Sequence, residues 1–76
     1  MPKITVYSKP NCMQCNFTQK YLDEKGINYA ILDVLADEAA LEHIKSLGFQ
    51  SLPVVEIEGE EAFNGFRPDL LAKLAV

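Results

Sequence analysis

The chain is 76 residues long, which fits a single small domain over residues 1–76 and excludes a second core. Hydrophobic residues make up 49% and charged residues 24%, so a disordered or low-complexity chain is excluded. Seven basic residues against eleven acidic residues give a net charge of −4, which argues against nucleic acid and anionic membranes as partners.

The first half of the chain predicts a strand, a helix and a second strand. Residues 3–7 read KITVY, a short run that suits a buried strand. Asn11 is a residue type that starts helices, and Gly26 supplies a helix end, so we predict a helix over residues 13–25. Residues 29–34 read YAILDV and predict a strand parallel to the first.

The middle of the chain predicts a second helix. Asp37 suits an N-cap and Gly48 a helix end, so we place this helix at residues 37–47. The apolar stripe that we expect to face the core consists of Ala40, Leu41, Ile44 and Leu47. The polar side chains of this helix, His43 among them, are expected to face away, and His43 is assigned no role.

The last third predicts a hairpin and a final helix. The expected hairpin elements are a strand over residues 54–57 after Pro53, a turn over 58–60 and a short strand over 61–63. Asn64 and Gly65 are expected to break this hairpin. Pro68 then suits the first position of a helix. Its apolar stripe consists of Leu70, Leu71 and Leu74.

The element order β-α-β-α-β-β-α predicts an α/β fold, with a four-stranded mixed sheet flanked by three helices. No apolar run approaches the roughly 20 residues that span a bilayer, and the N-terminus has no signal-type segment. We therefore expect a soluble cytosolic protein, and nothing in the pattern requires more than a monomer.

The two cysteines form a C-x-x-C pair, Cys12 and Cys15. If the helix begins at Cys12 or Met13, Cys12 lies at its N-terminal end and Cys15 lies one turn on. The free N–H groups and the positive pole of a helix favour the thiolate, and such sites lower a cysteine pKa to roughly 3.5 to 7.5. Cys12 is therefore the predicted nucleophile. Cys15, expected to be less accessible, would then attack the mixed disulfide that Cys12 forms.

Three other interpretations of the cysteine pair stay open. A purely stabilising disulfide gains little, because closing a four-residue loop contributes about 1.9 kcal/mol against about 3 kcal/mol for fifteen residues. A zinc site needs about four ligands, and the distant His43 would leave it dependent on a second molecule. Two unrelated buried cysteines are the third interpretation. The position of the pair between a strand-turn and a helix favours redox chemistry.

Residues near the cysteines have ordinary interpretations beside functional ones. Lys9 is a turn lysine whose charge would also favour a thiolate at Cys12. Two segments have two open interpretations, loop packing or contact with a partner protein. They are Phe49, Gln50 and Ser51, and Asn64, Gly65, Phe66 and Arg67. The first segment would border the site if Pro53 lies beside the cysteines.

The sequence resembles the thioredoxin and glutaredoxin superfamily and, within it, the NrdH-redoxins. Three segments carry this resemblance, which covers essentially the whole chain: CMQC at residues 12–15, GFQSLPVV at 48–55 and NGFRPD at 64–69. The first segment alone is a superfamily feature, whereas the three in order are specific. One difference concerns Phe63 and Asn64, where the family often has Trp and Ser, so Asn64 would have to remake any hydrogen bond of that Ser.

The resemblance implies a thioredoxin/glutaredoxin fold and a dithiol-disulfide oxidoreductase that binds no cofactor and no metal. Cys12 would be the attacking cysteine and Cys15 the resolving one, with Met13 and Gln14 tuning the pair. Leu52–Pro53 would be a cis peptide beside them, where the backbone of Leu52 would pair with a docked extended chain.

The resemblance also implies two protein partners. The chain would donate electrons to the large subunit of class Ib ribonucleotide reductase, and thioredoxin reductase would return electrons from NADPH.

A glutathione-dependent dithiol glutaredoxin is the alternative, but that class typically shows Pro-Tyr, Thr-Val-Pro and Gly-Gly-x-Asp-type segments. Here these places hold Met13-Gln14, residues 51–53 and residues 65–68. The bulky Phe66 and the rigid Pro68 should leave poorer access for glutathione. A metal- or cluster-carrying module is the less favoured, non-enzymatic alternative.

Overall fold

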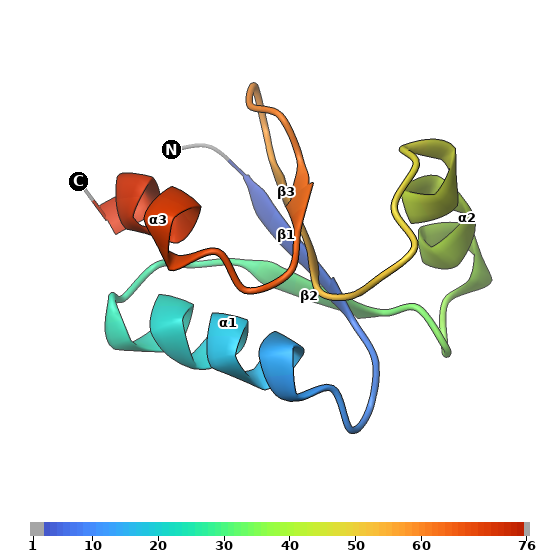
Figure 1. Cartoon of the computed structure of the whole chain (residues 1–76), viewed down its shortest axis with the longest axis horizontal. Coiled ribbons are helices and arrows are strands. Elements are labelled where there is room, and N and C mark those ends of the chain that lie inside the picture. The colour runs from blue at the N-terminus through green and yellow to red at the C-terminus, as the bar shows by residue number, and fades with distance from the viewer. Residues whose placement is uncertain (1–2, 76) are drawn as a thin grey trace.

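The computed structural model describes residues 3–75, and its helices and strands follow the predicted order (Figure 1). They are β1 (Ile4–Ser8), α1 (Met13–Glu24), β2 (Ala30–Asp33), α2 (Glu38–Ser46), β3 (Val54–Ile57), β4 (Phe63–Asn64), α3 (Pro68–Leu71) and a closing 3-10 helix (Ala72–Ala75). Over the described residues, no helix has the length and apolar character needed to cross a membrane.

The four strands form one mixed sheet in the order β2-β1-β3-β4. The central strand β1 pairs in parallel with β2, where Val6 lies opposite Ile31, and antiparallel with β3, where Val6 lies opposite Val55. The short β4 pairs antiparallel with β3. The predicted thioredoxin/glutaredoxin topology is therefore confirmed, and the C-terminal end of β1 meets the N-terminal end of β3 at one edge of the sheet.

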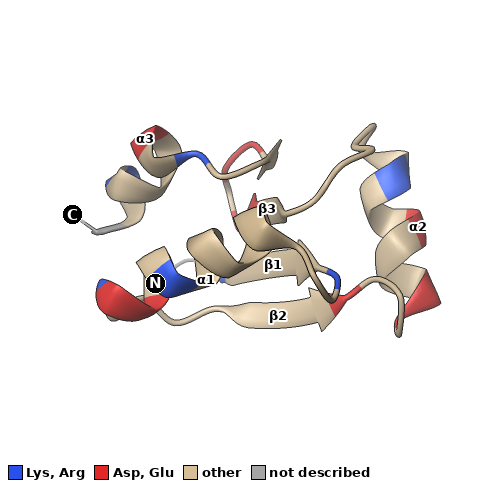
Figure 2. Ribbon diagram, turned by 60° about the horizontal axis from the view of Figure 1, so that its bottom comes forward, with Lys and Arg blue, Asp and Glu red and all other residues tan. Residues whose placement is uncertain are grey.

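The alternation of side chains along the strands divides the core between the two faces of the sheet. The cluster under α1 and α3 consists of Ile4, Val6, Leu22, Val55, Ile57, Phe63 and Leu71. The cluster under α2 consists of Tyr7, Val34, Ala40, Ile44 and Val54. Figures 1 and 2 show α2 set apart from α1 and α3, on the other side of the sheet.

Glycines end the two longer helices at the predicted places. Gly26 follows α1 with a φ of 67°, and Gly48 follows α2 with a φ of 90°, a backbone region that side chains with a Cβ disfavour. In both cases the next residue returns a hydrogen bond to the last turn, from Ile27 N–H to Leu22 O and from Phe49 N–H to Ile44 O. These caps place the helix ends within one residue of the prediction.

Three predicted details of the second half are wrong. The last strand covers Phe63–Asn64 and not residues 61–63, because pairing with β3 begins only at Phe63, and Asn64 belongs to the ladder instead of breaking it. The final helix turns into a tighter 3-10 helix after Leu71. Leu47 is 44% exposed, because it is the C-cap of α2 and its side chain leaves the apolar stripe.

His43 does not face away from the fold, which corrects a fourth prediction. Its Nε2 lies 2.8 Å from Glu56 Oε2, its ring centroid lies 5.8 Å from that of Tyr7, and the Tyr7 hydroxyl donates to Glu56 Oε1 at 2.8 Å. His43 reaches this position because it directly precedes the buried Ile44, at the margin of the buried helix face. We call Tyr7, His43 and Glu56 the polar rim.

Two pKa shifts accompany the polar rim. The hydrogen bond with His43, joined by the one from Tyr7, holds the pKa of Glu56 below its usual range against the opposing effect of burial. Burial first, and then the hydrogen bond to the carboxylate of Glu56, raise the pKa of Tyr7 to about 12. The rim therefore favours a carboxylate beside a neutral phenol.

Candidate active site

The turn between β1 and α1 places Cys12 immediately before the first residue of the helix. Asn11 has a φ of 61°, in the left-handed region that Asn tolerates better than most residues. Cys12 then adopts an extended backbone as the N-cap of α1, and its carbonyl oxygen accepts from Asn16 N–H at 3.1 Å. The predicted helix start is confirmed, and the capping position is held by Cys12 and not by Asn11.

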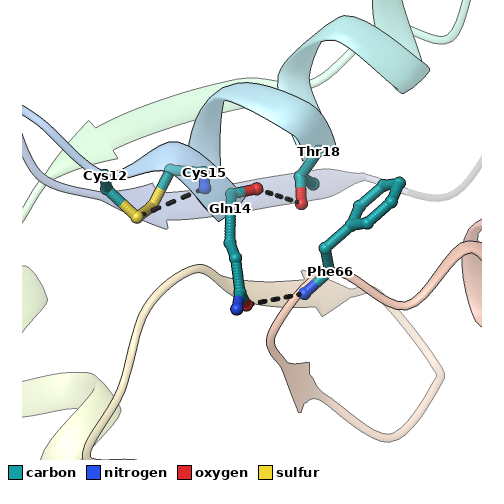
Figure 3. The surroundings of a disulfide bond; sticks show 5 residues. All are labelled: Cys12, Gln14, Cys15, Thr18 and Phe66. Carbon is teal, nitrogen blue, oxygen red and sulfur yellow. Dashed lines mark hydrogen bonds between the residues drawn. A yellow bond between two sulfur atoms is a disulfide. The ribbon is translucent and has the colours of Figure 1, made fainter.

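Cys12 and Cys15 are joined by a disulfide, with their Cα atoms 5.2 Å apart. The backbone N–H of Cys15 donates to Cys12 Sγ at 3.2 Å, so this sulfur has the role that a Ser or Asp oxygen usually has at an N-cap (Figure 3). In the reduced protein, a thiolate at the same place would accept this amide and face the positive pole of α1. The arrangement therefore suits an ionised Cys12 sulfur.

The two cysteines differ in accessibility in the predicted direction. Cys12 is 8% exposed, whereas Cys15 is fully buried on the inner face of α1 beside the buried Thr18 and Leu22. An incoming disulfide can thus reach Cys12 and not Cys15.

The segment before β3 lies at the same edge of the sheet as the cysteines. Leu52–Pro53 is a cis peptide, as the resemblance implies. Tyr7 pairs with Val54, so the preceding residue Pro53 lies opposite the end of β1. From this end of β1 the chain turns toward Cys12. Within this segment Phe49 packs half-buried against the core under α2, whereas Gln50 and Ser51 are exposed.

Residues 64–66 connect the segment before β3 to the C-x-x-C motif through three consecutive hydrogen-bond donors. These hydrogen bonds run from Asn64 Nδ2 to Ser51 Oγ (2.6 Å), from Gly65 N–H to Pro53 O (2.8 Å) and from Phe66 N–H to Gln14 Oε1 (3.3 Å). Asn64 thus does form a side-chain hydrogen bond at the position where the family often has Ser. The predicted site segments 12–15, 51–53 and 64–67 are brought together.

Aromatic side chains form an exposed apolar surface next to the disulfide. The Phe66 ring packs against α1, with its centroid 5.9 Å from that of Phe17 and 6.4 Å from that of Tyr21. We call Phe17, Tyr21 and Phe66 the aromatic surface. Phe17 is 48% exposed, and Met13, one helical turn before it, is 70% exposed. No charged residue occurs between Met13 and Gln19, so this part of α1 is uncharged (Figure 2).

The two cations near the site differ in their surroundings. Arg67 donates through Nε and an Nη to both carboxylate oxygens of Asp69, at 3.2 and 3.0 Å. This pair lowers the pKa of Asp69 and raises that of Arg67. Lys9 is exposed in the turn before Cys12. The charge of Arg67 is thus balanced by its own neighbour.

The site contains one feature that the sequence did not predict in kind. Gln14 was expected to tune the cysteines, but its carboxamide is directed to residue 66, far along the chain (Figure 3). Local spacing carries no signal for such a contact. Across residues 3–75, no group of three or more His, Cys, Asp or Glu side chains is placed to hold a metal ion.

Known proteins resemble this chain along nearly its whole length. The family model named Glutaredoxin matches residues 4–62. The glutaredoxin-like protein NrdH of Lactococcus lactis subsp. cremoris is 42% identical over 95% of this chain and 99% of its own length. The glutaredoxin-like protein NrdH of Escherichia coli is 35% identical over 95% of this chain and 88% of its own length.

A solved structure agrees with these sequence matches. The NrdH-redoxin from Escherichia coli, described as glutaredoxin-like with a thioredoxin-like activity profile, superposes with a TM-score of 0.89. It is 33% identical to this chain, and the match covers 95% of this chain and 93% of that structure. The agreement therefore extends over nearly the whole fold.

Proposed function

Because the chain belongs to the glutaredoxin family and, within it, to the NrdH-redoxins, we propose that its Cys12–Cys15 disulfide carries electrons from thioredoxin reductase to class Ib ribonucleotide reductase. The protein itself would bind no cofactor, and NADPH would be the ultimate electron source. With these partners the exchange would take place in the cytosol.

The reduced protein would act through its two sulfurs in turn. The Cys12 thiolate attacks one sulfur of the disulfide in the reductase large subunit, forming a mixed disulfide and releasing a thiolate that takes up a proton. The Cys15 thiolate then attacks Cys12 Sγ, forming the Cys12–Cys15 disulfide and releasing the second thiol of the partner. Two electrons and two protons pass to the partner, and the dithiol of thioredoxin reductase reverses the sequence.

The observation that carries the choice of reductant is the exposed apolar surface formed by the start of α1 and Phe66, after the C-x-x-C motif. Glutathione is a small charged tripeptide whose carboxylates need cations. Lys9 offers one cation in the turn before Cys12, but Arg67 is engaged with Asp69 at 3.0 Å. A protein partner instead gains from covering Phe17, Phe66 and Met13. The thioredoxin-like activity profile of the related Escherichia coli protein supports the same choice.

Several supporting roles belong to this proposal. Lys9 would favour the thiolate by its charge, and Met13 would be covered by the docked partner. The backbone at Leu52 would pair with an extended segment of the partner, beside Gln50 and Ser51. These roles rest on position and on the family resemblance.

The deciding experiment offers the oxidised protein two sources of electrons. One arm contains NADPH and thioredoxin reductase, and the other contains NADPH, glutathione and glutathione reductase. We expect NADPH consumption in the first arm only, with Cys12→Ser as the inactive control. Reduction in the glutathione arm alone would reverse the assignment in favour of a dithiol glutaredoxin.

The acceptor is tested separately. Class Ib ribonucleotide reductase, supplied with NADPH, thioredoxin reductase and this protein, should form deoxyribonucleotides repeatedly. Without the protein, turnover should stop after the enzyme's own thiols are spent. Deoxyribonucleotide formation that does not depend on the protein would contradict the proposed acceptor, while leaving the choice of reductant intact.

A further inference from the structure

The residue between the two cysteines that contacts residues 64–66 is Gln14. Its side-chain oxygen accepts the backbone N–H of Phe66 at 3.3 Å, across a sequence separation of 52 residues. The other two donors of this segment, from Asn64 and Gly65, connect to Ser51 and Pro53. Gln14 therefore provides the hydrogen bond that joins this segment to the C-x-x-C motif itself.

The position of Gln14 on α1 explains why this hydrogen bond affects the aromatic surface. Gln14, Phe17 and Tyr21 follow the spacing i, i+3 and i+7, so they lie along one stripe of the helix. The Phe66 backbone meets the first residue of this stripe, and the Phe66 ring meets the other two. Holding the Phe66 N–H thus fixes where its ring lies on α1.

Both ends of the contact are well supported. The main-chain carbonyl oxygen of Gln14 accepts from the hydroxyl of Thr18 at 3.0 Å, and Thr18 is fully buried (Figure 3). Gly65 has a φ of 83°, and a Cβ built there would lie 3.6 Å from Gln14 Oε1, so the backbone of residues 65 and 66 approaches the carboxamide closely. The contact joins two ordered segments, as a positioning contact requires.

We propose that Gln14 is a positioning residue for protein docking, which holds Phe66 in the aromatic surface next to Cys12. The inference rests on the proposed function, because it concerns how the protein partners of this site are bound. Gln14 does not take part in the sulfur chemistry. Its loss should weaken docking and leave the exchange step unchanged.

The test uses two substitutions that differ in the acceptor. Gln14→Met keeps the length and helix propensity of the side chain but loses the strong acceptor, whereas Gln14→Glu keeps an acceptor, a carboxylate oxygen in place of the amide oxygen. Gln19→Met, a change of the same kind five residues further along α1, is the matched control. The first readout is hydrogen exchange of the Phe66 amide by NMR, and the second is the steady-state kinetics with thioredoxin reductase.

For Gln14→Met we expect Phe66 amide exchange and KM each to rise about 3- to 10-fold, the effect of one modest hydrogen bond, with kcat within about twofold. Gln14→Glu should keep the slow Phe66 amide exchange, because a carboxylate oxygen still accepts this N–H, and Gln19→Met should keep the values of the unchanged protein in both readouts. A purely structural role would lower stability without this split between KM and kcat.

Two results would overturn the inference while leaving the proposed function intact. Unchanged Phe66 exchange in Gln14→Met would mean that the hydrogen bond does not hold the segment. Faster exchange with an unchanged KM would mean that the position of Phe66 does not matter for docking. If thioredoxin reductase reduces no form of the protein, the proposed function fails instead. The inference is then decided by the same KM comparison, with insulin disulfides as the substrate and dithiothreitol as the reductant.

Discussion

The two faces of the sheet carry different kinds of structure. Under α1 and α3, alternate residues of β1 and β3 form the larger of the two buried clusters among the described residues. Under α2 the cluster is smaller, and beyond it lie the polar rim and an open hollow of about 570 Å³. The same sheet thus supports a well-filled face and an incompletely covered one.

The difference between the faces indicates where rigidity is needed. Cys12, Cys15 and the aromatic surface belong to α1, whose inner residues pack on the well-filled face, so the sulfurs and the docking residues are held by apolar packing. The polar rim holds α2 through a charge-dependent contact at the edge of the other face. Changes on the first face should alter stability or exchange, whereas changes at the rim should alter mainly the dependence of stability on pH.

The largest expected effect comes from the cysteines on the first face. Cys12→Ser should lower the rate of disulfide exchange by more than about a thousandfold, because the attacking sulfur is lost. Cys15→Ser should accumulate mixed disulfides through Cys12, since the resolving sulfur is absent. Nonreducing gels and mass spectrometry of the protein with an oxidised partner measure both. Equal trapping by the two variants would contradict the division of roles.

A core substitution on the same face has the next largest effect. Leu71 is fully buried between α3 and the sheet, so Leu71→Ala should lower the free energy of unfolding by about 2 to 5 kcal/mol. Leu35→Ala is the control, because Leu35 is 71% exposed and its truncation should change stability by less than about 0.5 kcal/mol. Urea denaturation measures the difference. Similar losses for both variants would show that this face is not the stabilising one.

The contribution of the polar rim can be tested through the dependence of stability on alkaline pH, because Tyr7 titrates there. Its pKa is raised from 10.0 to about 12, so the folded state holds this proton more tightly than the unfolded state. The resulting stability is present below pH 10 and is lost as the pH rises toward 12, to an extent of about 2 to 3 kcal/mol at most. Tyr7→Phe should remove the larger part of this decline.

The alkaline measurement needs two precautions. The free energy of unfolding is followed in a background with Cys12→Ser and Cys15→Ser, which removes thiol and disulfide chemistry at high pH. In Tyr7→Phe a smaller decline of stability at alkaline pH should persist because of Tyr29, whose pKa is also raised by burial and by its hydrogen bond to Asp23. If the full decline persists in Tyr7→Phe, the rim is not its source.

The smallest expected effect on stability comes from substituting two glycines, one near each face of the sheet. Gly65 next to the site and Gly59 beside the hollow have φ values of 83° and 82°. A Cβ at Gly65 would make only an ordinary contact with Gln14, and one at Gly59 would meet nothing within 4 Å. Each substitution to Ala should therefore cost about 1 kcal/mol from backbone strain alone. Thermal melts measure both, and a much larger loss at Gly65 would reveal tighter packing of the site segment.

Much of the fold is predictable from the sequence because local signals mark its elements. Asp37 and Gly48 bound α2, and Gly26 ends α1, by backbone preferences that need no tertiary information. The turn residues before the C-x-x-C motif were enough to place Cys12 at the N-terminal end of the helix, and the structure identifies it as the N-cap. The cis Leu52–Pro53 peptide, in contrast, followed only from the family resemblance.

The contacts that local patterns did not predict join residues far apart in the sequence. Tyr7 and Glu56 are 49 residues apart, and Gln14 and Phe66 are 52 residues apart. The first contact depends on the register of β1 against β3, and the second depends on how residues 64–67 return to α1. His43 was misplaced for a related reason, because helical periodicity does not show that a carboxylate from β3 lies at the margin of α2.

The most direct test of the account is which sulfur reacts first in the reduced protein. Limiting iodoacetamide at neutral pH, followed by mass analysis of the peptides, should find the label on Cys12, the more accessible N-cap sulfur, with Cys15 unlabelled. Equal labelling of both cysteines, or faster labelling of Cys15, would contradict the claim that the start of α1 makes Cys12 the nucleophile.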